Sequence, residues 1–109
     1  MLFRSAGPDH ERFEQAKQEV ARHYDIMTDD PDEQLNAGRF YYLTGDSDRA
    51  LAAFGAVKRL DPQRSIDYFV GSVFMRKGDF QSAKKLFAQV PSTDQYYAEA
   101  QKMLKSIDH

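Results

Sequence analysis

The stretch GDSDRALAAF at residues 45–54 recurs in altered form as GDFQSAKKLF at residues 78–87. The two copies keep Gly, Asp, Ala and Phe in the same places, and each matched pair is 33 residues apart (78 − 45 and 87 − 54). A fixed period of this length is typical of proteins built from stacked, repeated units of secondary structure. The sequence therefore predicts a repeat architecture. The matched pairs are Gly45 with Gly78, Asp46 with Asp79, Ala50 with Ala83, and Phe54 with Phe87.

Apolar side chains recur with the spacing of an amphipathic helix through most of the chain. No segment shows the alternation of apolar and polar residues that an amphipathic strand requires. The sequence therefore predicts an all-α fold of helices without a sheet. The predicted helices cover residues 9–28, 32–43, 47–60, 65–76, 80–90 and 95–107. One face of the first carries Phe13, Ala16, Val20, His23 and Met27.

The boundaries between these helices have local causes. Asp30 and Pro31 offer an N-cap followed by a proline at the first helical position. Gly45 and Gly78 suit the left-handed residue that follows a helix end, and the Asp after each glycine can cap the next helix. All the connections are short, about two to six residues, so neighbouring helices are expected to lie antiparallel.

Two consecutive stretches resemble tetratricopeptide repeats, which are hairpins of two short helices: residues 31–64, and a second copy from about 64 to 96. In the family, a tryptophan stands near the start of the first helix, where this chain has Gln34 and Asp67. Pro91 comes early in the second copy, which shortens its second helix. The resemblance is carried by Gly38, Tyr41, Gly45, Ala50, Phe54, Leu60 and Pro62 in the first copy, and by Gly71, Phe74, Gly78, Ala83, Phe87 and Val90 in the second.

The alternation of small and large residues in these positions has a physical reason. Gly38 and Gly71 are expected where the two helices of a hairpin approach closely, because any side chain there would push the helices apart. Ala50 and Ala83 have the same role on the opposing helix. Large side chains then fill the space that the small ones leave. These large residues are Tyr41, Phe54, Phe74 and Phe87.

The resemblance implies an α-solenoid of antiparallel helix hairpins, with about two full repeats and flanking helices. The repeats are expected at residues 31–63 and 64–94. Residues 9–30 are expected to be the second helix of a truncated repeat, and residues 95–109 a capping helix or the start of a further repeat. Residues 1–8 are expected to be disordered or foreign, because MLFRS is also the translation of a common sequencing-adapter end. The natural chain would then begin further upstream.

Composition narrows the class of function. A chain of 109 residues is one domain with a modest core. Its 15 Lys and Arg nearly balance 17 Asp and Glu, which argues against a general polyanion-binding surface. The lack of Cys excludes disulfides, thiolate zinc sites and a cysteine nucleophile. Neither a signal peptide nor a membrane span is recognisable, so a soluble, cytoplasmic protein without membrane binding is expected.

No residue pattern points to an enzyme. The acids clustered at residues 29–33 lack the spacing of a calcium loop, and helix capping accounts for at least two of them. The three histidines lack the spacing of metal ligands, and nucleophile motifs and phosphate loops are absent. Two of the three basic pairs fall near helix C-termini, where the helix dipole favours cations. We therefore expect no catalytic residue, metal, cofactor or nucleic acid.

In the tetratricopeptide family, the first helices of the repeats line a concave groove that receives a peptide. By position, Tyr97 is a further first-helix tyrosine. The family's groove for chaperone C-termini needs Lys and Asn where this chain has Leu35 and Arg39, so that ligand is not expected. An alternative stays open, in which the candidate side chains pack between neighbouring repeats. The candidates for peptide binding are Leu35, Arg39, Tyr42, Tyr68, Ser72, Met75 and Arg76.

The expected function is that of a non-enzymatic interaction module, which binds a peptide or protein segment on the concave face of a short array. Affinity would come from the burial of apolar and aromatic surface, with Arg39 and Arg76 available for acidic groups. The alternative is a structural segment of a longer scaffold, whose main partner is the rest of its own chain. The unpaired N-terminal helix also predicts weak self-association.

Overall fold

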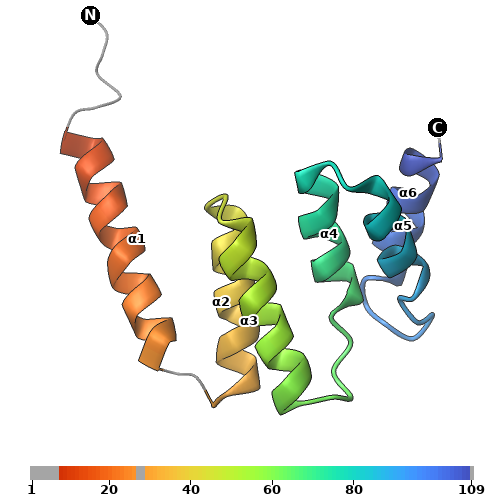
Figure 1. Ribbon diagram of the computed structural model, residues 1–109, viewed down its shortest axis with the longest axis horizontal. Coiled ribbons are helices and arrows are strands. Elements are labelled where there is room, and N and C mark those ends of the chain that lie inside the picture. The colour runs from red at the N-terminus through yellow and green to blue at the C-terminus, as the bar shows by residue number, and fades with distance from the viewer. Residues whose placement is uncertain (1–7, 27–28, 109) are drawn as a thin grey trace, which may run out of the picture.

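The computed structural model describes residues 8–26 and 29–108. In these residues the chain forms six α-helices and no strand, which confirms the predicted all-α fold (Figure 1). The expectations for residues 1–7 and for Met27 lie outside the described residues. The helices are α1 (Pro8–Ile26), α2 (Pro31–Leu43), α3 (Ser47–Leu60), α4 (Asp67–Lys77), α5 (Phe80–Ala88) and α6 (Tyr97–Ile107).

The helices follow one another across the molecule in chain order, with α1 at one end and α5 and α6 at the other (Figure 1). α2 packs against α3, and α4 packs against α5, as two antiparallel pairs. α4 also contacts α3, and α6 contacts α5. Short links enforce this pairing, since residues 44–46 and 78–79 are all that separates the two helices of each pair.

The links between α2 and α3 and between α4 and α5 have the same backbone conformation, a left-handed glycine followed by a capping aspartate. Gly45 and Gly78 have φ angles of +86° and +84°, in the left-handed region that glycine adopts without steric cost. The carboxylates of Asp46 and Asp79 then accept hydrogen bonds from the backbone N–H three residues on, at 3.1 and 3.2 Å. Asp30 caps α2 in a similar way, accepting from a backbone N–H of the first turn at 2.9 Å. The predicted turn glycines and caps are confirmed.

Close approach of the paired helices occurs at two glycines. A Cβ atom built on Gly38 would lie less than 3.0 Å from three ring carbons of Phe54 on α3. A Cβ atom built on Gly71 would lie 2.9 Å from the nearest ring carbon of Phe87 on α5. The sequence distance is 16 residues in both cases (54 − 38 and 87 − 71). The predicted contact between a small and a large residue is therefore present in both helix pairs.

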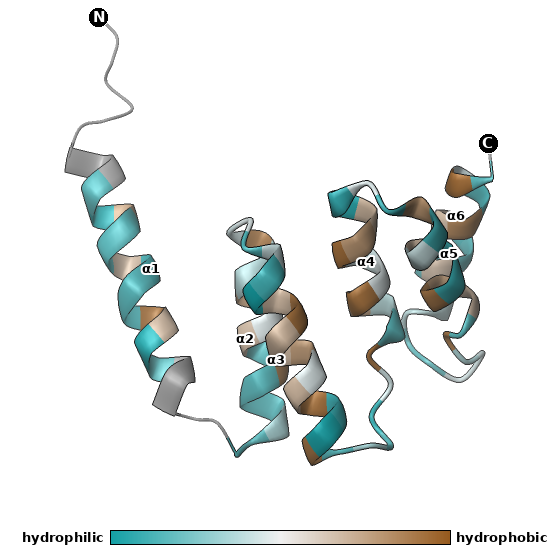
Figure 2. Ribbon diagram, viewed as in Figure 1, coloured by the Kyte–Doolittle hydropathy of each residue, from teal (hydrophilic) through white to brown (hydrophobic). Residues whose placement is uncertain are grey.

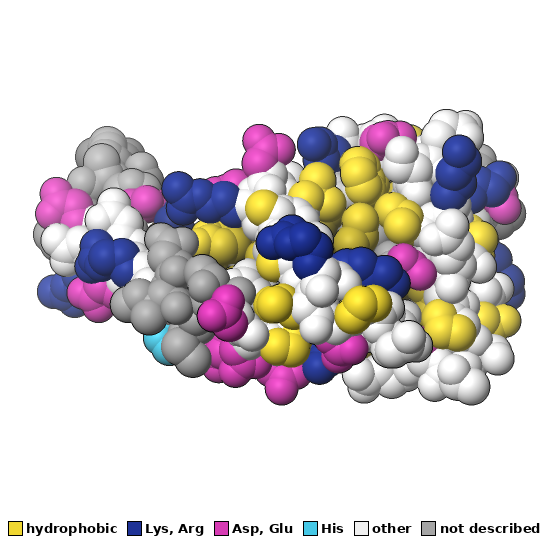
Figure 3. Space-filling model, turned by 60° about the horizontal axis from the view of Figure 1, so that its bottom comes forward, with side chains coloured by type: hydrophobic (Ala, Val, Ile, Leu, Met, Phe, Trp, Pro, Cys, Tyr) yellow, Lys and Arg dark blue, Asp and Glu magenta, His cyan; other side chains and the backbone are white. Residues whose placement is uncertain are grey.

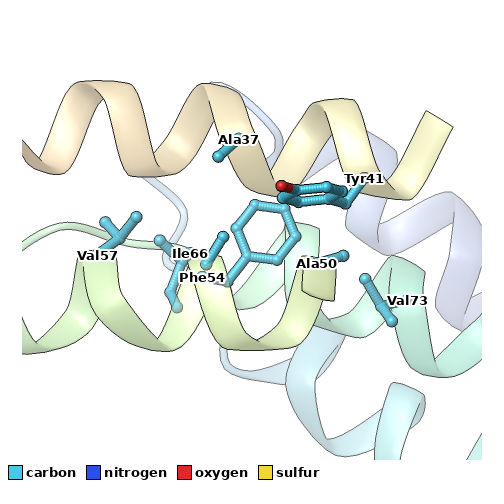
Figure 4. Packing of buried hydrophobic residues seen from close by; sticks show 8 residues of the cluster. Ala37, Tyr41, Ala50, Phe54, Val57, Ile66 and Val73 are labelled. Carbon is cyan, nitrogen blue, oxygen red and sulfur yellow. The ribbon is translucent and has the colours of Figure 1, made fainter. Parts of the chain in front are cut away.

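The buried residues form two clusters. The first lies between α2, α3 and the start of α4, and Figure 4 shows Tyr41 and Ala37 on one helix facing Phe54 on the other. The second lies between α4, α5 and α6. All eight residues that the sequence assigned to packing are buried, apart from half-buried Phe74. The first cluster is Ala37, Tyr41, Ala50, Ala53, Phe54, Val57, Ile66 and Val73, and the second is Ala83, Phe87, Val90 and Ala100.

Several helix ends differ by one residue from the predicted bounds, and the three that follow differ by two. α4 begins at Asp67 and α6 at Tyr97, each two residues later than predicted, and α5 ends at Ala88, two residues earlier. The residue before a proline is disfavoured in the helical conformation, so Pro91 ends α5 early. Val90 packs into the second cluster from the turn that follows, with 3% exposure. The longer link at residues 89–96 runs from α5 to α6.

α1 is more polar than the other helices and stands at the end of the row (Figure 2). Ala21 packs against the first core cluster, and the imidazole Nε2 of His23 lies 3.4 Å from a carboxylate oxygen of Glu33 at the start of α2. On the predicted apolar face, however, Phe13 is 57% exposed and Val20 is 36% exposed. This face of α1 is not covered by the described residues.

Candidate functional site

A cleft with a volume of about 230 Å³ opens between α2, α4 and the segment that precedes α6. We call it the aromatic cleft, because five of its eight lining residues carry an aromatic ring. On the face shown in Figure 3, hydrophobic side chains gather over the middle of the molecule, beside Lys and Arg side chains. The aromatic cleft is lined by Arg39, Tyr42, Leu43, Phe54, Tyr68, Phe69, Ser72 and Tyr96.

The aromatic walls of the cleft are held by ring packing. Tyr68 and Tyr96 stack almost parallel, with centroids 4.7 Å apart and planes at 3°. Phe69 meets Tyr96 edge to face at 5.0 Å, and it also stacks on Phe54 of the first core cluster at 5.6 Å. Such pairs are favourable beyond the burial of their area. The rings are therefore fixed in place by the hydrophobic core and present a rigid surface.

Tyr96 reaches the cleft because its backbone is fixed by Asp94. The Asp94 carboxylate accepts a hydrogen bond from the Tyr96 N–H at 2.7 Å, and the Asp94 carbonyl accepts one from the Tyr97 N–H at 3.0 Å. These bonds form the turn before α6 and direct the Tyr96 ring toward α4. Tyr97, the tyrosine that the sequence suggested, does not line the cleft and is 37% exposed. Its neighbour Tyr96 lines the cleft instead.

Tyr68 is a half-buried tyrosine in the wall of the aromatic cleft. Its partial burial raises the pKa of the hydroxyl above the ordinary value of 10.0, and the negative charge of Glu99 raises it further, while a hydrogen bond with Ser72 acts in the opposite direction. The hydroxyl is therefore protonated at neutral pH and can donate a hydrogen bond. The Ser72 hydroxyl donates to the Tyr68 carbonyl at 2.9 Å, within α4.

Two arginines stand at the α2 and α4 side of the cleft. The guanidinium of Arg39 lies over the ring of Phe69, 5.8 Å from its centroid. The guanidinium of Arg76 lies over the ring of Tyr42, 3.8 Å from its centroid, and also donates to the Tyr42 carbonyl. Cations over aromatic faces are attracted by the ring quadrupole. Arg76 thereby ties the end of α4 to the end of α2.

A second, more polar cleft adjoins the first and shares three of its lining residues, Arg39, Phe69 and Tyr96. Arg64 in this polar cleft is held by Asp32 at 2.8 Å and by Asp61 at 3.3 Å. The hydrogen bond with Asp32 raises the pKa of the guanidinium, so it remains charged. Its lining residues are Leu35, Arg39, Arg64, Ser65, Phe69, Asp94, Gln95 and Tyr96.

The structure thus brings together four of the seven candidates from the sequence, namely Arg39, Tyr42, Tyr68 and Ser72, in one cleft. Leu35 lines the polar cleft beside it. Arg76 lies on the Tyr42 ring at the edge of the aromatic cleft. Met75 is half-buried and packs against the second core cluster, so it does not line either cleft.

Sequence reasoning missed three residues of the aromatic cleft: Leu43, Phe69 and Tyr96. Helical spacing could have found the first two, because Leu43 follows Arg39 by four residues and Phe69 precedes Ser72 by three. Leu43 is 77% exposed at the end of α2. Tyr96 is the N-cap residue of α6, and the spacing with Ala100 and Met103 placed it on the packing face of that helix without indicating the cleft.

The part of the chain that the structure describes carries neither a cluster of metal-ligating side chains nor a helix suited to cross a membrane. There, no group of three or more His, Asp or Glu side chains could hold a metal ion. Within the same residues, none of the helices combines the length and the apolar character of a membrane span.

Fold and site together define an all-helical protein with a small aromatic cleft built from α2, α3, α4 and the segment before α6. Comparisons with protein-family models, with curated protein sequences and with solved structures give no match. The function has to be inferred from the chain's own residues.

Proposed function

We propose that the chain is a short α-solenoid of the tetratricopeptide type, which binds a peptide segment of another protein in the aromatic cleft. The observation that supports this proposal is that candidate residues from separate parts of the chain meet in one cleft. Arg39 and Tyr42 from α2, Tyr68 and Ser72 from α4, and Tyr96 before α6 line the same small cleft. Tyr42, Phe69 and Tyr68 also pack against the core clusters, yet an open cleft remains between them.

The repeat assignment is supported by contacts that recur after 33 residues (78 − 45). The left-handed glycine, the capping aspartate and the contact between glycine and phenylalanine are each present in both helix pairs. Equivalent contacts at a constant offset are what two copies of one structural unit produce. Stacked units of this kind form extended concave binding surfaces.

The size and chemistry of the cleft favour a peptide over a small molecule. Its volume of about 230 Å³ lies below the range of roughly 300–1,000 Å³ that small-molecule pockets occupy. One or two side chains of an extended segment would fit into it. Tyr and Arg are also the residue types that most often carry interface energy. The walls are rigid, so little conformational entropy is lost on binding.

The proposal is tested by selecting peptides from a displayed random library against the full chain and titrating the winners by calorimetry. Tyr42→Ala removes one wall of the cleft and should weaken binding by about 1–2 kcal/mol, near tenfold. Tyr97→Ala is the matched control, because Tyr97 is an exposed tyrosine outside the cleft. Melting curves show whether each variant remains folded. Equal affinity of the two variants for every selected peptide would refute peptide binding in the cleft.

A second candidate function is supported by α1. Its exposed Phe13 and Val20 suit a helix that packs against further helices, so the chain would serve as a structural segment of a longer array. In that case the selection would yield no peptide that depends on Tyr42. Added helical sequence before α1 would instead raise the melting temperature and protect the Phe13 ring from solvent.

A further inference from the structure

Resting on the proposed function, we infer that the segment bound in the aromatic cleft carries an acidic side chain next to its apolar anchor, and that Arg39 selects it. The apolar anchor follows from the ring walls. The acidic neighbour follows from the distribution of charge around those walls.

Arg39 is the charged side chain of the aromatic cleft, and among the described residues it has no carboxylate partner. Two other arginines of the described residues are engaged, one of them in the adjoining polar cleft. Arg49 lies 3.5 Å from a carboxylate oxygen of Asp46, and Arg64 lies 2.8 Å from one of Asp32. The exposed guanidinium of Arg39 rests on the Phe69 ring, which leaves its N–H donors available at the mouth of the cleft.

Arg76 adds a second positive charge on the same side. Its guanidinium is held against Tyr42 by the ring face and the backbone carbonyl, so it is already ordered before a ligand arrives. Both arginines therefore border Tyr42, one through the shared cleft and the other through stacking. An anion beside the Tyr42 ring would meet both charges.

Negative charge lies toward α6, at the part of the polar cleft that the chain before α6 forms. Asp94 lines the polar cleft, with one carboxylate oxygen already accepting from the Tyr96 N–H. Glu99 is close enough to raise the pKa of the Tyr68 hydroxyl, and its carboxylate lies 3.5 Å from the Lys102 ammonium. An acidic side chain would be repelled from the α6 side and attracted to the α2 and α4 side. The charges therefore orient the bound segment as well as select it.

The test uses three pools of acetylated, amidated octapeptides with a fixed Leu or Tyr anchor followed by Asp, Asn or Lys. Randomised positions exclude charged residues, and amidation removes the terminal carboxylate. Binding is followed by fluorescence anisotropy on the full chain. We expect the Asp pool to bind at least about threefold more tightly than the Asn pool, with the Lys pool weakest. The advantage should shrink as salt rises, because a partly exposed charge pair is screened.

Substitutions assign the effect to one side chain. Arg39→Gln should reduce the preference for Asp over Asn to the part that Arg76 supplies, and Arg39→Glu should shift it toward Lys. Arg59→Gln is the matched control, because it removes the same charge from an exposed position outside both clefts. It should leave the order of the pools unchanged.

The experiment distinguishes failure of the inference about acidity from failure of the proposed function. Equal binding of the Asp and Asn pools, or an Asp preference that is undiminished in Arg39→Gln, overturns the inference about acidity. The proposed function then stands if Tyr42→Ala still weakens binding of every pool. If no pool binds, or if Tyr42→Ala binds all pools as the unchanged chain does, the inference and the proposed function both fall.

Discussion

Gly38→Ala should destabilise the fold, although alanine is the better helix former. The added Cβ would lie less than 3.0 Å from three carbons of the Phe54 ring, a distance that real Cβ atoms essentially never show. Phe54 is 1% exposed and is enclosed by the first core cluster, so its ring has little room to move. The change in unfolding free energy caused by this one methyl group therefore reports how closely α2 and α3 approach.

The magnitude follows from two opposing effects. Overpacking a core by a methyl group costs about 1–3 kcal/mol, whereas replacing Gly by Ala inside a helix gains about 1 kcal/mol. The difference is a net loss of about 0–2 kcal/mol in unfolding free energy, and for Gly38→Ala we expect the upper part of this range because three ring carbons would lie less than 3.0 Å from the new Cβ. Gly71→Ala should lose less, because its nearest ring carbons on Phe87 lie at 2.9, 3.0 and 3.2 Å and need a smaller shift.

Gly55→Ala is the control for helix propensity. Gly55 lies inside α3, and a Cβ there would have no neighbour within 4 Å. It should stabilise the chain by up to about 1 kcal/mol. Urea unfolding of all three variants gives the comparison, supported by melting temperatures, where 1 kcal/mol corresponds to about 4–8 °C.

A double variant tests whether Phe54 is the cause. Phe54→Leu should cost less in the Gly38→Ala background than in the unchanged chain, because the smaller side chain relieves the overlap. If Gly38→Ala stabilises the chain as much as Gly55→Ala does, the inference that α2 and α3 approach closely at Gly38 is wrong. Additive costs in the double variant would mean that the destabilisation arises elsewhere.

Three further outcomes are expected. Ser65→Ala should be neutral or slightly stabilising in urea unfolding, because the buried Ser65 hydroxyl has no hydrogen-bond partner among the described residues. Hydrogen bonds from Ser82 lower the pKa of Asp79 below its ordinary value of 3.8. The Asp79 cap therefore stabilises the fold above pH 3.8, and this stabilisation is lost as the pH falls through the lower pKa of the folded state. In Asp79→Ala, unfolding curves measured against pH should lack this loss of stability in acid. Phe13→Asp should abolish any concentration-dependent self-association seen by analytical ultracentrifugation, since Phe13 is exposed on the uncovered face of α1.

Many residues of the aromatic cleft could be predicted from the sequence, by helical spacing and by the 33-residue offset of the repeat. Arg39 and Tyr42 are three residues apart, and Tyr68 and Ser72 are four apart, so each pair shares a helix face whatever the tertiary structure. The resemblance to a helical repeat then predicted that the two faces meet. Tyr96 was beyond reach, because the turn that directs its ring depends on Asp94 and on the packing of α6.

Local sequence was sufficient to predict the helices, their turns and which helices pair within each hairpin. Helical hydrogen bonds, left-handed glycines such as Gly45 and caps such as Asp46 join residues only a few positions apart, so local chemistry decides them. The contact of Gly38 with Phe54 was also fixed locally, by a short turn between two regular helices.

The contacts between the two helix pairs follow from the tertiary structure alone. The stacking of Arg76 on Tyr42, the enclosure of the aromatic cleft by Tyr96 and the exposure of Phe13 depend on how one helix pair is placed against the next. That placement is set by the summed packing of many side chains distant in sequence. No local pattern encodes it, and the cleft that carries the proposed function is formed there.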